Sequence, residues 1–181
     1  RGETGLEEKE VREVIGKYFE QTRKKVVPQK GAGPDFLGEG VAVETKPTNF
    51  DFERAFRQYV NYAFKYVGLW IVLPEDSLDI RSILTLYLMD RVLWEKHLKS
   101  TKLYIVAKRT EKEYSVREFA IKDFFLEVIA KIPDGFRYYH QTKPSEAIQE
   151  IVSRLSDLDM ELKSVVSKMV KDHYSSVKIS L

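Results

Sequence analysis

The chain has 181 residues, a formal net charge of +2 and no cysteine. Its length fits one domain with its own core, and the lack of cysteine excludes disulfides, thiolate zinc sites and cysteine-bound iron–sulfur clusters. A charge so close to balance gives no general attraction to nucleic acid, so any basic surface has to be local.

The first predicted element is an amphipathic helix over residues 6–20. Five apolar residues recur there at helical spacing: Val11, Val14, Ile15, Tyr18 and Phe19. The same segment is rich in glutamate, and most of these acids are expected to be surface charges that favour a helix N-terminus.

A β-hairpin over residues 33–46 follows, with a two-residue turn at Glu39-Gly40, because glycine tolerates the positive φ that such turns need. This register places Asp35 opposite Glu44, with Cβ atoms about 4.5–5.5 Å apart. Glu44 and Lys46 are two residues apart and share a face. Two carboxylates so close repel unless one is protonated or a cation lies between them, and Mg²⁺ suits an all-oxygen site. The alternative is an ordinary hairpin with solvated charges.

A second amphipathic helix is predicted to start near Phe52, capped by Asn49 or Asp51 and ended by Gly68. Its apolar stripe comprises eight residues: Phe52, Ala55, Phe56, Tyr59, Val60, Ala63, Phe64 and Val67. The opposite face is polar, with Gln58 and Tyr62 one turn apart. Basic residues on this helix would suit phosphate contact: Arg54, Arg57 and Lys65.

The rest of the core alternates helices and short apolar strands. Strands are expected at residues 69–73, 103–107 and 113–116, and helices at 79–99 and 117–131. This order predicts an α/β fold with a mixed central sheet flanked by helices. We divide the chain into a core domain (1–132), a linker (133–144) and a C-terminal helix (145–173).

The C-terminal segment has a heptad pattern. Seven apolar residues are spaced alternately by three and four: Ile148, Ile151, Leu155, Leu158, Leu162, Val165 and Met169. This pattern predicts a helix-pair seam, which favours a homodimer. Docking of the helix onto its own domain is the alternative, and extra valines beside the stripe also allow a bundle.

Pro34-Asp35, followed nine residues later by Glu44-Thr45-Lys46, resembles the signature of the PD-(D/E)XK nuclease superfamily, which includes restriction enzymes, archaeal Holliday junction resolvases and RecB-like nucleases. The predicted α-β-β-α-β order is similar to the core of that restriction endonuclease-like fold. The resemblance implies that Asp35 and Glu44 bind a metal ion and that Lys46 positions the attacking water.

Gln58 and Tyr62 are similar to the Gln-x-x-x-Tyr motif of RecB-like nucleases, which implies that Gln58 lies beside the active site and that Tyr62 supports it or contacts DNA. In the superfamily a glutamate of the first helix often points at the metal. Glu10 is our first choice for that residue and Glu7 the second. Further candidates for DNA contact are Arg54 and Lys30.

These features predict a Mg²⁺-dependent deoxyribonuclease, with Mn²⁺ as a substitute ion and no organic cofactor. A dimeric endonuclease acting on branched DNA and an exonuclease that processes ends both remain open. The competing class is a non-catalytic nucleic-acid-binding or assembly protein with an idle nuclease-like core. No signal-peptide pattern and no bilayer-length apolar run is present, so we expect a cytoplasmic protein without a membrane partner.

Overall fold

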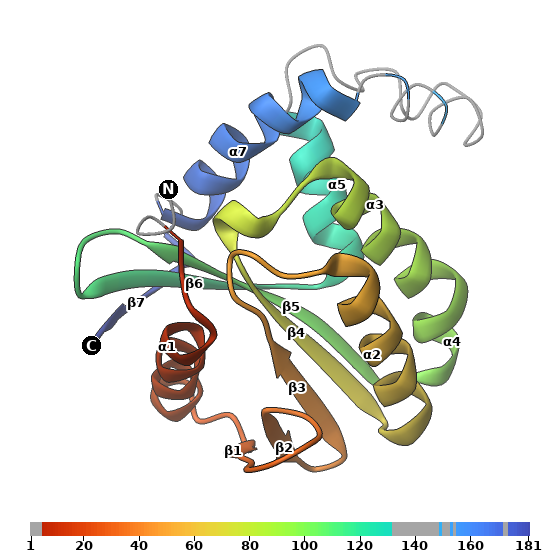
Figure 1. Ribbon diagram of the computed structural model, residues 1–181, viewed down its shortest axis with the longest axis vertical. Helices are drawn as coiled ribbons and strands as arrows, with labels where there is room; N and C mark the ends of the chain where they lie inside the picture. Colours follow the sequence, from red (N-terminus) through yellow and green to blue (C-terminus); the bar gives the residue numbers. More distant parts are fainter. Residues whose placement is uncertain (1–4, 132–148, 150–152, 154, 172–173) are drawn as a thin grey trace.

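The computed structural model describes residues 5–131, 149, 153, 155–171 and 174–181. Over this part the chain forms one mixed sheet with helices on both of its faces (Figure 1). The predicted α/β class is therefore confirmed. The predicted linker, with most of the segment before residue 155, lies outside the described residues.

The sheet has seven strands, whose spatial order follows their order in the chain. The strands are β1 (Val27–Pro28), β2 (Phe36–Gly38), β3 (Val41–Thr45), β4 (Gly68–Pro74), β5 (Ser100–Lys108), β6 (Glu113–Phe119) and β7 (Val177–Ser180). The pairs β3/β4 and β4/β5 are parallel, and all other pairs are antiparallel. Parallel neighbours require a long crossover, and helices supply it after β3 and after β4.

The helices match their predicted ranges only in part. The helix expected at 117–131 begins at Ile121, because residues 117–119 extend β6, and the second helix ends at Lys65 because Gly68 already begins β4. They are α1 (Glu8–Gln21), α2 (Phe52–Lys65), α3 (Ile80–Met89), α4 (Glu95–His97), α5 (Ile121–Lys131) and α7 (Leu155–Lys171). Asp51 caps α2, and Asp79 caps α3 by accepting a hydrogen bond from the backbone N–H of Ser82 at 2.7 Å. The helix predicted at 79–99 is divided, because a π-helical turn, Asp90–Trp94, separates α3 from α4.

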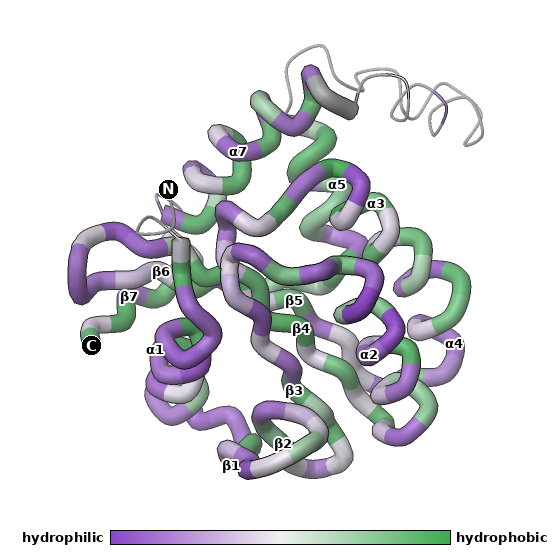
Figure 2. The backbone as a smooth tube through the Cα atoms, viewed as in Figure 1, coloured by the Kyte–Doolittle hydropathy of each residue, from purple (hydrophilic) through white to green (hydrophobic). Residues whose placement is uncertain are grey.

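Side chains of the central strands alternate between two apolar cores. Val43, Val72 and Val106 pack towards α1, whereas Ala42 and Ile71 pack towards the layer of α2, α3, α5 and α7. Figure 2 shows the resulting hydrophobic centre along β4 and β5. Strands buried on both faces need apolar residues at nearly every position, which explains their continuous apolar runs.

The buried side of α2 differs from the prediction. Ala55, Tyr59 and Tyr62 are buried, whereas Phe64, expected inside, is 80% exposed, and Val67 is also exposed. α2 is rotated about its own axis away from the orientation that the apolar stripe predicts, and this rotation buries Tyr62 against the protein. The same rotation allows polar residues of α2 to reach the end of β3.

The described part of the C-terminal helix docks onto its own chain. Five of its side chains are buried in the core: Leu158, Leu162, Val166, Met169 and Val170. Asp159 also accepts a hydrogen bond from the backbone N–H of Ile80 at 2.7 Å and so helps to cap α3. The structure thus shows the intramolecular alternative for this segment, and the homodimer stays a prediction.

None of the helices that the structure describes combines the length and the apolar character that crossing a bilayer requires.

Candidate functional site

The candidate site lies at the C-terminal end of β3, which is also the end of the parallel strands β4 and β5. Ligands of α/β proteins commonly bind at this edge. Glu44 is the fourth residue of β3, and Lys46 follows the strand with its backbone N–H donating to the carbonyl of Val72 at 3.2 Å. Both charged side chains therefore leave the sheet where its central strands end.

The hairpin turn that leads into β3 forms as predicted. Gly38 pairs with Val41, and Glu39 and Gly40 both have positive φ, at 53° and 79°. Positive φ at both central residues is the type I′ geometry, whose twist matches that of the flanking strands.

Asp35 lies just before β2, where the regular ladder ends. Its backbone N–H donates to the carbonyl of Val43 at 2.9 Å, so it does not stand opposite Glu44 as the simple register predicts. Its Oδ2 instead accepts hydrogen bonds from the backbone N–H and the hydroxyl of Thr45, both at 2.9 Å. The carboxylate is thus fixed beside the end of β3.

Glu44 is a buried carboxylate, only 4% exposed. Its Oε2 lies 3.1 Å from Nζ of Lys46, but its buried Oε1 has no hydrogen-bond partner in the protein. Burial raises the pKa of Glu44 to about 7, and the nearby negative charge of Asp35 adds to this effect, whereas Lys46 opposes it. A buried, unsatisfied oxygen is costly, so this position favours a proton or a cation.

Lys46 connects β3 to α2. Its Nζ donates to Oε1 of Gln58 at 2.6 Å while it pairs with Glu44. Gln58 and Tyr62 are one helical turn apart on α2; burial raises the pKa of Tyr62 to about 12, while Gln58 lowers it. Glu44, Lys46 and Gln58 therefore form one continuous chain of contacts, with Tyr62 one turn further along α2. Tyr62 is 7% exposed, so most of its surface contacts protein.

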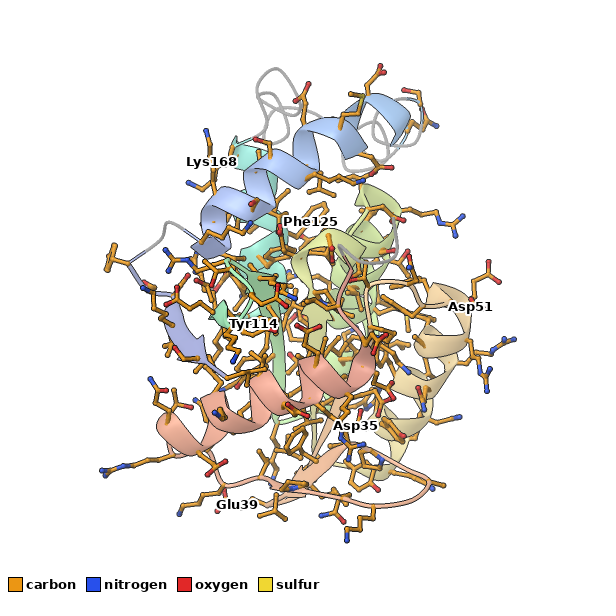
Figure 3. All side chains as sticks on the ribbon, turned by 60° about the vertical axis from the view of Figure 1, so that its left-hand side comes forward. Asp35, Glu39, Asp51, Tyr114, Phe125 and Lys168 are labelled. Atoms are coloured by element: carbon orange, nitrogen blue, oxygen red, sulfur yellow. The ribbon has the colours of Figure 1, made fainter. Side chains whose placement is uncertain are left out.

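The structure places Glu10 away from this chain. Glu10 accepts hydrogen bonds from Nζ of Lys108 at 3.1 Å and from the hydroxyl of Tyr114. Although burial raises it, these bonds lower the pKa of Glu10 overall. In Figure 3, Tyr114 and Asp35 lie on opposite sides of α1. Metal binding by Glu10 stays a prediction, and it would require Glu10 to leave both partners.

Arg12 is a site residue that the sequence did not single out. Its Nη1 lies 3.3 Å from Oδ1 of Asp35, and its Nη2 donates to the carbonyl of Gln29 at 2.7 Å. Glu8, one helical turn earlier, is the α1 acid whose charge contributes to raising the pKa of Glu44. Residues at i and i+4 share a helix face. The spacing of Glu8 and Arg12 could have predicted that both face the site, but only once Arg12 is known to face Asp35.

The remaining DNA-contact candidates lie outside this chain of contacts. Arg54 and Lys30 are both exposed, and no ion pair joins either to another described residue. Contact of these residues with DNA stays a prediction.

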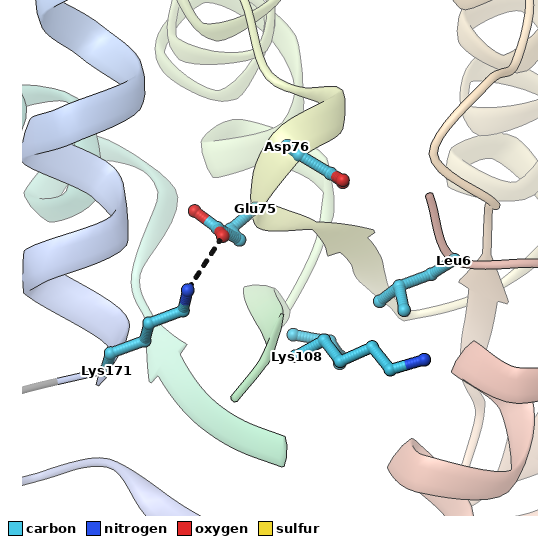
Figure 4. Close-up of a pocket in the computed structure, with 6 residues that line it drawn as sticks. Leu6, Glu75, Asp76, Lys108 and Lys171 are labelled. Atoms are coloured by element: carbon cyan, nitrogen blue, oxygen red, sulfur yellow. Dashed lines mark ion pairs between the residues drawn. The ribbon is translucent and has the colours of Figure 1, made fainter. Parts of the chain in front are cut away.

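A polar cavity of about 170 Å³ lies at the C-terminal ends of β4 and β5, and Figure 4 shows its lining, which includes Glu75, Asp76, Lys108 and Lys171. Lys171 pairs with Glu75 at 3.6 Å, and Lys108 pairs with Glu10. Both cavity lysines are thus neutralised within the protein, which leaves little positive charge for an anionic ligand.

The donor set fits a magnesium ion with only two protein carboxylates. Within the described ranges, no group of three or more His, Cys, Asp or Glu side chains is placed to hold a metal. Mg²⁺ keeps several waters, however, and is often bound through one or two carboxylates. The unpartnered Oε1 of Glu44 and the adjacent charge of Asp35 are compatible with such an ion.

Comparison with protein-family models, curated proteins and solved structures finds no match to this chain. Its function is therefore inferred from the geometry of the site and from the sequence motif.

Proposed function

We propose that this protein is a metal-dependent nuclease of the PD-(D/E)XK type that hydrolyses phosphodiester bonds in DNA. The observation that carries the proposal is Glu44, a buried carboxylate with one unpartnered oxygen, held between Asp35 and Lys46 at the end of the parallel strands. The order of α1, the antiparallel strands β1–β3, α2 and β4 supports a restriction endonuclease-like fold.

Asp35 and Glu44 are the residues that would hold Mg²⁺ or Mn²⁺. Such an ion lowers the pKa of a bound water and neutralises charge on a phosphoryl oxygen. The carboxylate of Asp35 is oriented by two hydrogen bonds from Thr45, so its position does not depend on the ion.

Lys46 supplies a fixed donor beside these carboxylates. Glu44 and Gln58 both contact its Nζ, at 3.1 Å and 2.6 Å. Nζ would orient the attacking water and stabilise the negative charge that develops on the phosphate, as a preorganised donor does. The water oxygen bonds to phosphorus, and one bridging P–O bond breaks to leave a phosphate end and a hydroxyl end.

The proposal includes a homodimer and leaves open which DNA structure is cut. A homodimer would need a surface other than the apolar side of α7, because the described part of that side is buried within the chain. Branched DNA and DNA ends are both substrates that such a nuclease could cut.

One observation favours a second candidate, a nucleic-acid-binding protein that does not cut. Both oxygens of Asp35 already have partners, with Thr45 on Oδ2 and Arg12 near Oδ1. A carboxylate satisfied in this way can be purely structural.

Cleavage assays on plasmid, linear and four-way-junction DNA with Mg²⁺ or Mn²⁺ separate the two candidates. We expect Glu44→Gln and Lys46→Ala to abolish cutting. Glu39→Gln, which alters an exposed carboxylate at the tip of the same hairpin, should leave it unchanged. Equal activity in all variants would refute the assigned site, and binding of DNA without cutting by the wild type would favour the second candidate.

A further inference from the structure

A groove of about 390 Å³ lies between the first turns of α2 and α3. Its lining consists of Phe52, Glu53, Phe56, Arg57, Arg81 and Thr85. We propose that this groove binds one unpaired nucleotide of a nucleic-acid strand, with the base against the phenylalanine rings and the phosphate on the two arginines. The proposal rests on the proposed function for the identity of the partner as nucleic acid.

The groove lies at the same end of the sheet as the candidate site. α2 follows β3 and α3 follows the turn after β4, so both helices begin where the parallel strands end (Figure 1). Arg57 in the groove directly precedes Gln58, which binds Lys46. A strand held at Lys46 would therefore reach the groove along α2.

The two arginines are available to an anion. Arg57 and Arg81 are exposed, and neither forms an ion pair with any residue in the described part of the chain. Arg91, by contrast, pairs with Glu95 at 3.2 Å, and Arg117 pairs with Glu127 at 3.0 Å. A free guanidinium presents a planar set of donors that matches a phosphate.

The phenylalanine rings form a fixed apolar wall. The rings of Phe52 and Phe56 are 5.9 Å apart, and Phe56 is also 6.5 Å from the ring of the buried Trp94. Both phenylalanines remain partly exposed to the groove. Nucleobases stack on such rings, and each stacked base strengthens binding by roughly tenfold.

The size and charge pattern favour an unpaired nucleotide over a duplex. A volume of about 390 Å³ is near the lower end for small-ligand pockets, and the faces of paired bases are hidden in the duplex stack. Glu53 repels phosphate but accepts hydrogen bonds from an exocyclic amino group, such as that of cytosine. Glu53 therefore orients the base edge towards itself and leaves the phosphate to the arginines.

Binding of labelled oligonucleotides in chelator, where no cleavage can occur, tests the proposal. We expect the double variant Arg57→Ala/Arg81→Ala to bind single-stranded oligo-dC at least tenfold more weakly, with a shallower salt dependence. The matched control Lys96→Ala/Lys99→Ala removes the same charge from exposed positions near α4, and its affinity should change less than twofold. Glu53→Gln should reduce the preference for oligo-dC over oligo-dT.

Equal weakening in the two double variants would reduce the effect to general charge and overturn the proposal, as would unchanged binding in both. Equal losses for duplex and single strand would overturn the assignment to an unpaired nucleotide. Thermal unfolding of each variant confirms that binding is compared between folded proteins.

A small chromogenic phosphodiester, bis(p-nitrophenyl) phosphate with Mn²⁺, separates this proposal from the proposed function, because it is too small to extend from Lys46 into the groove. The groove variant should hydrolyse it at the wild-type rate, whereas Glu44→Gln should not hydrolyse it. Failure of the wild type to hydrolyse any diester would refute the nuclease, while selective loss of oligonucleotide binding in the groove variant would still support the groove.

Discussion

Glu44→Gln should stabilise the metal-free protein at alkaline pH. Glu44 has a pKa of about 7 in the folded chain against an ordinary value of 4.5, and a difference of one pKa unit corresponds to about 1.4 kcal/mol. Below pH 4.5 the carboxyl is protonated in both folded and unfolded chains and imposes no penalty. Between pH 4.5 and 7 the unfolded chain ionises this carboxyl while the folded chain keeps it protonated, so stability falls until the buried group also ionises near pH 7. The full loss is about 3 kcal/mol.

Glutamine avoids this loss because it stays neutral at every pH. Its carbonyl can still accept a hydrogen bond from Lys46, as Oε2 of Glu44 does. The free energy of unfolding of the variant, relative to wild type, should therefore rise by about 3 kcal/mol between pH 4.5 and pH 8.

Urea unfolding in chelator measures this difference, with the fluorescence of the buried Trp70 and Trp94 as the probe. Carboxylates that do not interact with Glu44 contribute equally to both proteins and cancel in the comparison. Glu39→Gln, which makes the same chemical change at an exposed carboxylate, serves as the control for replacing Glu by Gln. A difference for Glu44→Gln that is the same at pH 5 and pH 8 would refute the reasoning. Mg²⁺ at pH 8 should stabilise the wild type and not the variant.

Three further predictions concern Arg12, Gln58 and the docking of α7. Arg12→Gln removes the positive charge near Asp35, so Mn²⁺ should bind more tightly by calorimetry; weaker binding would mean that Arg12 only supports the fold. Gln58→Leu leaves Lys46 without one acceptor, and we expect kcat for DNA cleavage to fall at least tenfold with little change in stability, which thermal unfolding checks. Leu162→Ala should cost roughly 2–5 kcal/mol of stability because Leu162 is fully buried, whereas Met160→Ala, at an 80% exposed position, should cost little. If urea unfolding gives the two α7 variants the same stability, α7 does not dock as described.

Local chemistry explains which parts of the fold could be predicted. The turn at Glu39-Gly40 was predictable because few sequences other than those with glycine form a two-residue hairpin. Strands β4 and β5 were recognisable because burial on both faces leaves continuous apolar runs. By contrast, β7 was missed because four residues, two of them polar, carry little signal. Its pairing with β6 joins segments far apart in the chain.

The site was predictable in composition but not in detail. Spacing placed Glu44 and Lys46 on one face, and the structure adds the bond from Lys46 to Gln58. The rotation of α2 that buries Tyr62 could not be predicted. On the isolated helix, an orientation that buries Phe64 is as favourable as one that buries Tyr62. The partners of Glu10 come from β5 and β6, so they could not be predicted from the helical pattern of α1.

Burial of Glu44 destabilises the folded protein, and the surrounding fold holds it in place. The carboxylate is carried by β3, which pairs with β4 at Glu44 and with β2 up to Val43, between two apolar cores, so the backbone has little freedom to let Oε1 reach water. A more flexible strand would relieve the repulsion from Asp35 by moving the two carboxylates apart. Rigid placement of groups that destabilise the protein is typical of functional sites. A purely structural charge gains nothing from such placement, whereas a cation ligand gains its affinity from it.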